Sequence, residues 1–273
     1  MTRYAQLPSA EVGVIGGSGL YQLVADGTAV EVSTPYGRPS DPVTVGHIDG
    51  RTVAFLPRHG ADHRLPPHRI NYRANLWALR ALGVRQILAP CAVGSLTAEL
   101  GPGALVLPDQ MVDRTSGRAC TYFDDGAVHT SFADPYCPNG RTTVAAAARE
   151  IGFEPVVGAT MVVVEGPRFS TRAESQWYAH QGWQLINMTG HPEAILAREL
   201  ELCYTPIALV TDLDAGVDAD DAVSQAAVLR IFAANVERLR EVLYQAIPAL
   251  PPDPFTCACG QGHQGVPLPI TLP

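Results

Sequence analysis

Two aspartates, Asp212 and Asp214, stand one residue apart directly after the apolar run at residues 207–210. If a strand continues through them, their side chains point to one face of the sheet. Two carboxyl groups close together in a partly buried site repel each other, so one is expected to hold a proton near neutral pH. A protonated carboxyl can donate to the ring nitrogen of a departing base. The residues alone leave two alternatives open, a metal-binding pair and a cap of the next helix.

A glycine cluster follows another apolar run near the start of the chain, in the stretch VGVIGGSGLY at residues 12–21. Such a loop can present backbone N–H groups and the Ser18 hydroxyl to an oxyanion. Its glycines lack the G-x-G-x-x-G spacing of dinucleotide-binding folds, and no Gly-Lys-Ser/Thr follows as in a Walker loop. The spacing therefore disfavours a nucleotide-binding oxidoreductase, whereas a noncatalytic binding module that uses this loop stays open as the alternative from another functional class.

Compact polar motifs end four further apolar runs. In open α/β sheets, ligands bind outside the carboxyl ends of the strands, so these endings are expected to meet at one site. Arg58 and His59 offer a guanidinium fork and an imidazole, a pair suited to phosphate. Phe169 is either a core side chain or a face for a planar ring, with Ser170 beside it. The motifs are PRHG at 57–60, PCAVGS at 90–95, EGPRFS at 165–170 and NMTGHPE at 187–193.

Short Val/Ile/Leu-rich runs bounded by Gly or Pro predict strands, and segments with apolar residues at helical spacing lie between them. This alternation predicts a single α/β domain over residues 1–250, with a central mixed, largely parallel sheet flanked by helices. Residues 110–140 lack periodicity and are expected to be irregular, and residues 251–273 form a Pro/Gly-rich tail. Strands are expected at 12–16, 43–48, 52–57, 85–90, 104–107, 159–164, 184–188 and 205–211, and helices near 70–82, 141–151, 171–181, 192–201 and 222–246.

The 273 residues carry a formal net charge of −8, and they are 47% hydrophobic and 17% charged. This composition is typical of a globular protein and lacks the basic footprint of a nucleic-acid-binding domain. No apolar run reaches the ~18 residues of a transmembrane helix, and the first residues do not form a secretory signal. We therefore expect a cytoplasmic protein without a nucleic-acid or membrane partner.

Six cysteines are present, and Cys257 and Cys259 form a Cys-x-Cys pair with His263 close by. Zinc sites usually combine two such ligand pairs. Here a fourth ligand and a second cysteine pair are missing, so no metal is expected. A tail without a special role, or one with a redox-active cysteine pair, is favoured. The cysteines at 91, 120, 137 and 203 look like isolated thiols.

Together these motifs resemble the trimeric purine nucleoside phosphorylase family, and within it the S-methyl-5'-thioadenosine phosphorylases. The resemblance covers residues 11–245, and several long motifs in a fixed order make it specific. The motifs are GVIGGSGLY, FLPRHG, INYRANLWALRALG, AVGSL, VEGPRFSTRAES, INMTGHPEAILARE and TDLD.

The resemblance implies a nucleoside phosphorylase-like fold and a pentosyltransferase reaction. Members of the family cleave the N-glycosidic bond of a purine nucleoside with inorganic phosphate as co-substrate, and no further cofactor is expected. For this sequence the resemblance implies a homotrimer that converts 5'-methylthioadenosine to adenine and 5-methylthioribose-1-phosphate, in purine and methionine salvage. The alternative is action on methylthioinosine, inosine, adenosine or another 5'-substituted purine nucleoside.

The resemblance also implies roles for individual residues. Asp212 and Asp214 are expected to hydrogen-bond the purine at N7 and the exocyclic amine, and an acceptor at Asp212 favours a 6-aminopurine. His129 is expected to close the 5' pocket of a neighbouring subunit. The phosphate-binding residues are then Ser18, Arg58, His59, Cys91, Ala92 and Thr189, and the nucleoside-binding residues are Phe169, Ser170, Met188, His63, His129, Gln225, Val228 and Leu229.

Two departures from the family pattern concern the 5' group of the substrate. The methylthio enzymes usually keep an apolar face here, which Val228 and Leu229 provide, whereas Gln225 can hydrogen-bond a 5'-hydroxyl. Gly190 and His191 stand where a Thr-Val pair is common. The sequence therefore leaves the 5' substituent open between methylthio, hydroxyl and another group such as a halogen.

Overall fold

The computed structural model describes residues 4, 6–17, 20, 23–24, 26–217, 223–254 and 256–273. Within them, eleven strands form one mixed sheet with the main order β2-β3-β4-β1-β5-β10-β9-β7, and β11, β6 and β8 branch from β5. The strands are β1 (Val12–Gly16), β2 (Thr28–Val30), β3 (Val43–Ile48), β4 (Arg51–Pro57), β5 (Gln86–Ser95), β6 (Leu105–Leu107), β7 (Gln110–Arg114), β8 (Val156–Val157), β9 (Thr160–Val164), β10 (Leu185–Asn187) and β11 (Cys203–Leu213). The helices are α1 (Tyr72–Ala81), α2 (Pro138–Glu150), α3 (Arg172–His180), α4 (Gly190–Glu199) and α5 (Gln225–Ala249), with short 3-10 turns η1 (Pro67–Arg69) and η2 (Ala258–Gln261).

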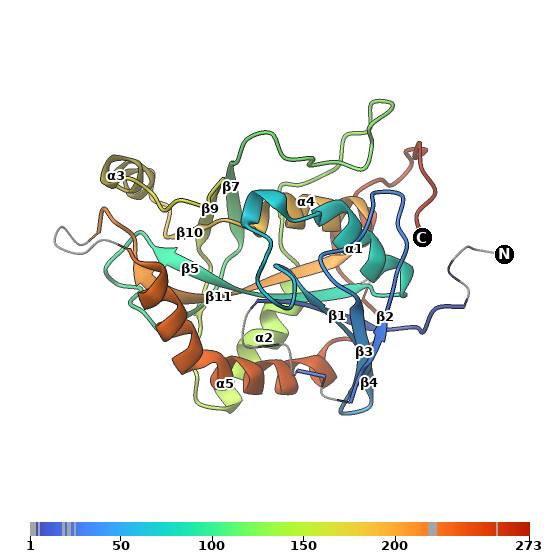
Figure 1. The fold of residues 1–273 in the computed structure, drawn as a ribbon, viewed down its shortest axis with the longest axis horizontal. Helices are drawn as coiled ribbons and strands as arrows, with labels where there is room; N and C mark the ends of the chain where they lie inside the picture. The colour runs from blue at the N-terminus through green and yellow to red at the C-terminus, as the bar shows by residue number, and fades with distance from the viewer. Residues whose placement is uncertain are drawn as a thin grey trace.

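Helices cover both faces of this sheet, with α1 and α4 on one face and α2 and α5 on the other (Figure 1). Strand β4 explains this arrangement. Val53 and Phe55 belong to the apolar cluster of α2 and α5, whereas Ala54 and Leu56 belong to the cluster of α1 and α4. A strand that is apolar at consecutive positions requires cover on both faces. The fold is therefore the single α/β domain with a mixed, largely parallel sheet that the sequence predicts.

The centre of the sheet sets the geometry of its carboxyl-end edge. Strands β4, β1, β5 and β11 run parallel to one another. Strand β10 meets β5 from the opposite direction and pairs Ile186 with Gly94. The residues that follow β10 are thereby carried back over the last third of β5, where the polar motif of β5 lies.

All the predicted strands and helices are present, but β2, β7 and β8 were not predicted. The expectation of irregular structure throughout 110–140 is wrong at both ends, because β7 begins at Gln110 and α2 begins at Pro138. The sequence QMVDR of β7 shows no strict alternation, and the strand forms by parallel pairing with β9. Local pattern therefore cannot reveal it, because its partner lies 50 residues further along the chain.

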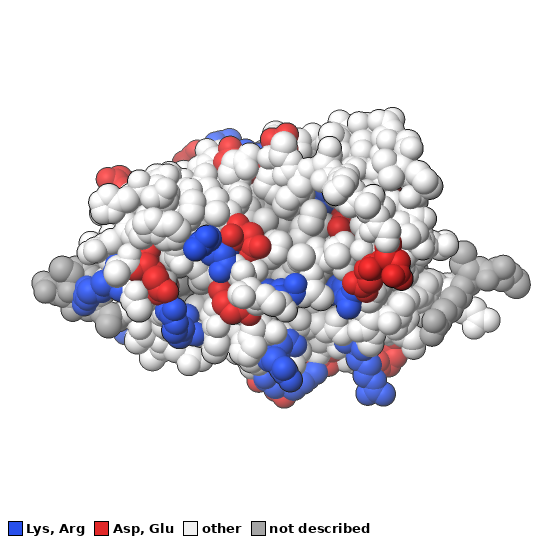
Figure 2. Space-filling model, turned by 90° about the horizontal axis from the view of Figure 1, so that it is seen from above, with Lys and Arg blue, Asp and Glu red and all other residues white. Residues whose placement is uncertain are grey.

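The segment after α5 returns to the body of the protein. Leu268, Ile270 and Leu272 pack against the apolar cluster that contains α1 and α4. None of the helices in the described part of the chain is both long and apolar enough to cross a membrane. On the face seen in Figure 2, basic side chains are interspersed with acidic ones.

Gly140, in the first turn of α2, packs directly on Thr205 of β11. A Cβ at Gly140 would overlap Thr205 Oγ1 and lie 3.1 Å from Thr205 Cβ. We expect Gly140→Ala to lower the free energy of unfolding by about 1–3 kcal/mol, because Thr205 is buried and the helix must move away from the sheet. Urea denaturation measures the change.

The matched control is Gly101→Ala, since a Cβ at Gly101 meets nothing within 4 Å. It should unfold at nearly the same urea concentration as the parent protein. Equal midpoints for the two variants would show that α2 does not require this close approach.

Candidate active site

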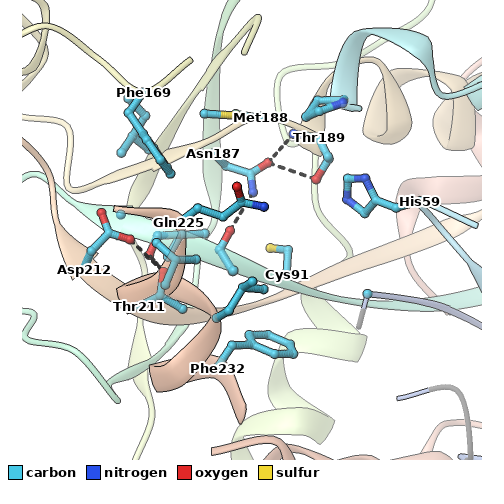
Figure 3. Close-up of a pocket in the computed structure, with 18 of the residues that line it drawn as sticks. His59, Cys91, Phe169, Asn187, Met188, Thr189, Thr211, Asp212, Gln225 and Phe232 are labelled. Carbon is cyan, nitrogen blue, oxygen red and sulfur yellow. Dashed lines mark hydrogen bonds between the residues drawn. The ribbon is translucent and has the colours of Figure 1, made fainter. Parts of the chain in front are cut away.

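A cavity opens at the carboxyl ends of β4, β5 and β11, between the segment that follows β10 and the first turns of α5. Figure 3 shows Asp212 and Thr211 at one end and His59 and Thr189 at the other, with Phe232 on the α5 side. The cavity brings together almost all the site residues that the sequence predicts. They are Arg58, His59, His63, Cys91, Ala92, Phe169, Ser170, Met188, Thr189, Asp212, Asp214, Gln225, Val228 and Leu229.

Two predicted residues are not part of this group. Ser18 lies outside the described residues, although its neighbour Gly17 lines the cavity. His129 is exposed on the segment between β7 and α2 and does not line the cavity of its own chain. Its contribution to a neighbouring subunit remains a prediction.

Arg58 is held by a buried ion pair that the sequence analysis did not predict. Its Nε donates to Glu193 Oε2 at 2.8 Å and its Nη2 donates to Glu193 Oε1 at 2.9 Å. Nη2 also donates to the carbonyl of Ile15, and Nη1 donates to the carbonyl of Pro90. Of the five N–H donors of a guanidinium, these contacts use four, and the second N–H of Nη1 is left over.

The ion pair between Arg58 and Glu193 lies entirely in the protein interior. Arg58 is 2% exposed and Glu193 is 0% exposed. Burial by itself lowers the pKa of Arg58, but the charge and hydrogen bonds of Glu193 raise it above its ordinary value. Tyr204 adds a third contact by donating to Glu193 Oε1 at 2.7 Å. The first turn of α4 is therefore tied to the end of β4.

His59 is a neutral hydrogen-bonding group in this site. Its Nδ1 lies 2.8 Å from the carbonyl oxygen of Leu65, which can only accept, so Nδ1 carries the proton. The pKa of His59 is lowered to about 4, chiefly by burial and in smaller part by the nearby Arg58 and His63, although the Leu65 hydrogen bond acts in the opposite direction. The Nε2 atom of the neutral ring is then an acceptor. His63 stacks on His59 with ring centroids 4.5 Å apart.

Asn187 organises the loop that leads from β10 into α4. Its Oδ1 accepts from the backbone N–H groups of Thr189 and Gly190, at 2.7 Å each. Its Nδ2 donates to the carbonyl of Ala92 on β5 at 3.0 Å (Figure 3). The loop is thus locked to β5, and the Thr189 side chain, which caps no backbone group of α4, is placed beside His59.

The two aspartates occupy the other end of the cavity. Strand β11 continues to Leu213, and its register against β5 shifts between Val210 and Asp212. Asp212 Oδ1 accepts from Thr211 Oγ1 at 2.7 Å. A Cβ at Gly94 would lie 3.0 Å from Asp212 Oδ2 and 2.8 Å from Ile186 Cγ2, so a glycine at position 94 makes room for this carboxyl group.

Both carboxyl groups are poorly solvated. The pKa of Asp212 is raised to about 6, chiefly by burial and in smaller part by the charge of Asp214, although the Thr211 hydrogen bond acts in the opposite direction. Burial also raises the pKa of Asp214, with hydrogen bonds from Ser175, the Ala215 backbone and Ser170 acting in the opposite direction. Asp214 Oδ2 is buried and has no hydrogen-bond partner among the described residues. Asp214 therefore presents an unused oxygen in a site that disfavours its charge.

The remaining walls of the cavity are largely apolar. Phe169 and Met188 lie on one side and Phe232 on the other (Figure 3). Cys91 lies between the two ends, and burial raises its pKa to about 12 although Arg58 opposes this. Cys91 is therefore a neutral thiol in the wall of the cavity and not a thiolate nucleophile.

Sequence reasoning missed the residues that support the site from behind. Glu193 and Asn187 both lie within the motif NMTGHPE, and Gly94 lies within AVGS. These motifs were recognised in the sequence, but the residues that these side chains contact lie far away in the chain. Glu193 contacts Arg58, Asn187 contacts Ala92, and Gly94 faces Asp212. Sequence reasoning also missed Phe232, which lines the cavity, although its position one turn beyond Val228 is the signal that places it on the same face of the helix.

The chain belongs to the phosphorylase superfamily, whose model matches residues 11–248. It is 60% identical to the purine nucleoside phosphorylase of Streptomyces coelicolor, over 97% of this chain and 98% of that protein. It is 59% identical to the S-methyl-5'-thioadenosine phosphorylase of Mycobacterium tuberculosis, over 96% of this chain and 97% of that protein. A solved methylthioadenosine phosphorylase from an antarctic soil metagenomic library has a TM-score of 0.86 at 42% identity, covering 93% of this chain and 91% of that one.

Removing Glu193 tests the buried ion pair. We expect Glu193→Ala to lower the free energy of unfolding by about 3–5 kcal/mol, because Arg58 is left as an uncompensated charge in the interior. Urea denaturation without phosphate measures this loss.

Glu154→Ala is the control, because Glu154 forms an exposed ion pair with Arg149 at 2.9 Å. Such a surface pair contributes at most about 1 kcal/mol. If both variants unfold at the same urea concentration, Glu193 does not anchor α4 to the sheet.

Proposed function

We propose that the protein cleaves the N-glycosidic bond of 5'-methylthioadenosine with inorganic phosphate, giving adenine and 5-methylthioribose-1-phosphate. The observation that carries this proposal is the arrangement of one cavity, with two buried carboxyl groups at one end and His59 and Thr189 at the other. The names of the Mycobacterium tuberculosis relative and of the solved structural neighbour support it. The name of the Streptomyces coelicolor relative keeps another purine nucleoside as the alternative.

Phosphate binds at the end of the cavity that holds His59, Thr189 and Gly17. Neutral His59 accepts from the P–O–H group of the phosphate dianion through Nε2, since Nδ1 is occupied by Leu65. Thr189 and the remaining N–H of Arg58 donate to the other phosphate oxygens. The site thus binds an anion through oriented donors and through a guanidinium whose charge is largely balanced by Glu193.

The purine binds at the opposite end, against Phe169 and within reach of Asp212 and Asp214. As the glycosidic bond breaks, positive charge develops on the ribosyl ring and negative charge on the base. The phosphate dianion stabilises the first and forms the new C1'–O bond as the C1'–N9 bond breaks, while Asp214 in its protonated form donates its proton to N7 of the departing base. Each such prearranged contact contributes on the order of 3–4 kcal/mol to lowering the barrier.

Asp212 selects the base. With a pKa of about 6, its carboxyl is mainly ionised at neutral pH and accepts from an exocyclic N6 amine. A 6-oxo group at the same position offers only an acceptor, so adenine is preferred over hypoxanthine.

The first turns of α5 select the 5' group. Val228, Leu229 and Phe232 provide apolar surface for a methylthio group, and Leu229 is 45% exposed at the mouth of the cavity. Gln225 lines the same wall and can hydrogen-bond a 5'-hydroxyl. Methylthioadenosine is therefore favoured and adenosine is the expected second substrate.

The proposal extends to the assembly. A homotrimer in the cytoplasm, acting in purine and methionine salvage, would use His129 from one subunit at the 5' end of the next subunit's cavity. The exposure of His129 on the segment between β7 and α2 supports this role. No cofactor beyond phosphate is needed for the reaction.

A substrate panel tests the proposal. It crosses adenine or hypoxanthine with a 5'-hydroxyl or 5'-methylthio group, with and without phosphate, and measures release of the free base. We expect phosphate-dependent release, fastest from 5'-methylthioadenosine. Absence of release from both adenine nucleosides would refute the function, and a preference for inosine-type bases would replace it with the alternative.

Asp214→Asn tests the proposed acid. We expect turnover to fall about 100- to 10,000-fold, the usual contribution of a positioned proton donor, because an amide cannot supply a proton to N7. Phosphate affinity, measured by calorimetry, should stay near the parent value because Asp214 lies at the other end of the cavity. Equal losses of turnover and phosphate affinity would contradict this role.

A pH series separates the chemical role of Asp214 from a structural one. Burial raises its pKa above the ordinary 3.8, so the folded protein binds this proton more tightly than the unfolded chain. The parent protein therefore loses stability as the pH rises from the ordinary value through the raised one, and Asp214→Asn should lose less stability over the same range. Asp49→Asn, at an exposed position, is the control. Its turnover and the dependence of its stability on pH should match those of the parent protein.

A further inference from the structure

Four cysteines from distant parts of the chain converge on one point behind α4. Cys137 caps the start of α2, Cys203 begins β11, and Cys257 and Cys259 lie on the segment after α5. Their four Sγ atoms all lie within 4.8 Å of one another. The Cys257 Sγ atom is 3.7 Å from that of Cys137 and 3.5 Å from that of Cys203. The second cysteine pair that the sequence pattern lacked is therefore supplied by the fold.

Backbone hydrogen bonds place the two inner cysteines. The N–H of Cys137 donates to the carbonyl of Tyr204 at 2.8 Å, which fixes the start of α2 beside β11. The N–H of Cys203 donates to the carbonyl of Arg85 at 2.9 Å. Both side chains are buried, as is that of Cys259. These three thiols are thus held in place by rigid elements or by packing. Cys257, which is half-buried, is the fourth member of the group.

The spacing of the sulfur atoms suits one tetrahedral metal ion. Zinc binds thiolates at about 2.3 Å in four-coordinate structural sites. Tetrahedral geometry then separates the sulfur atoms by about 3.8 Å, close to the 3.5 and 3.7 Å observed around Cys257. All four cysteines are free thiols in the structure.

The surroundings of the cluster stabilise negatively charged sulfur. Arg198 Nη2 donates to Cys259 Sγ at 3.9 Å. Cys137 lies at the N-terminus of the 13-residue helix α2, where the helix dipole favours a thiolate. Four thiolates on a divalent ion carry a net charge of 2−, which Arg198 and this helix terminus offset.

His263, the candidate third ligand from the sequence, does not belong to the cluster. Its Nε2 atom donates to the carbonyl of Glu199 at 3.0 Å, and its ring packs edge-on against Phe123 at 5.2 Å. His263 instead docks the end of the chain on the last turn of α4.

We propose that Cys137, Cys203, Cys257 and Cys259 bind one structural Zn²⁺ ion, which fastens the C-terminal segment to α2 and β11. On binding, each thiol that is still protonated releases its proton, and each sulfur donates an electron pair to the ion. The cluster does not line the catalytic cavity, so the ion acts on the stability of the segment that carries Leu268, Ile270 and Leu272 onto the core.

The test begins with the full-length protein, purified under reducing conditions without added metal or chelator. Elemental mass spectrometry should find about one zinc per chain, as for a four-cysteine site. Cys257→Ser and Cys259→Ser should lose most of this zinc. Cys120→Ser is the matched control, since Cys120 is an exposed thiol outside the cluster, and it should keep its zinc.

A second set of measurements uses only the parent protein, so its outcome does not depend on whether a cysteine variant folds. Zinc released from the parent protein by a thiol-specific mercurial is followed with a metal-sensitive dye. After chelation, the C-terminal segment should be cut many-fold faster by a protease and the melting temperature should fall, while turnover of the undigested protein at low temperature stays within about twofold. Intact-mass measurement after alkylation counts free and disulfide-bonded cysteines in the same samples.

Three outcomes would overturn the proposal. One is metal-free protein with all four thiols open to alkylation. Another is metal-free protein in which the cluster forms disulfides. The third is iron, recognised by its visible absorption, in place of zinc in protein made with both metals present.

Discussion

The bidentate contact between Arg58 and Glu193 is the interaction on which the site depends. Neither charge is stable alone in the interior, because an unpaired buried ion costs several kcal/mol. Two further Arg58 N–H groups donate to the carbonyls of Ile15 on β1 and Pro90 on β5, so one side chain joins three strands to the first turn of α4. The position of Thr189, which directly precedes α4, follows from this connection.

Burial shifts the pKa in opposite directions at the two ends of the cavity, and in each case it disfavours the charged form of the side chain. It raises the pKa of the carboxyl groups of Asp212 and Asp214, and it lowers the pKa of His59. The Arg58 charge is balanced by Glu193. In the proposed reaction, a phosphate dianion adds two negative charges at the His59 end, next to the place where positive charge would develop on the ribosyl ring.

Much of the fold could be predicted because its central strands are apolar on both faces and its helices carry apolar stripes. Strand β4 is an example, since its own residues determine that it must be covered twice. Strand β7 shows the limit, because it exists only through pairing with β9. Many candidate site residues could likewise be selected from polar motifs at strand ends, whereas His63, Gln225, Val228 and Leu229 came from the family resemblance. The structure places nearly all the described ones in one cavity.

By itself, the sequence determined which residues could bind phosphate and a purine, because the chemistry of those motifs is local. The tertiary structure decided what supports them and what the C-terminal cysteines can do. Glu193 lies 135 residues from Arg58, and Cys257 lies 120 residues from Cys137. Ion pairs and metal-sized clusters depend on distances of a few ångströms between side chains. Only the packing of α4, α2 and β11 sets those distances, and no spacing along the chain records them.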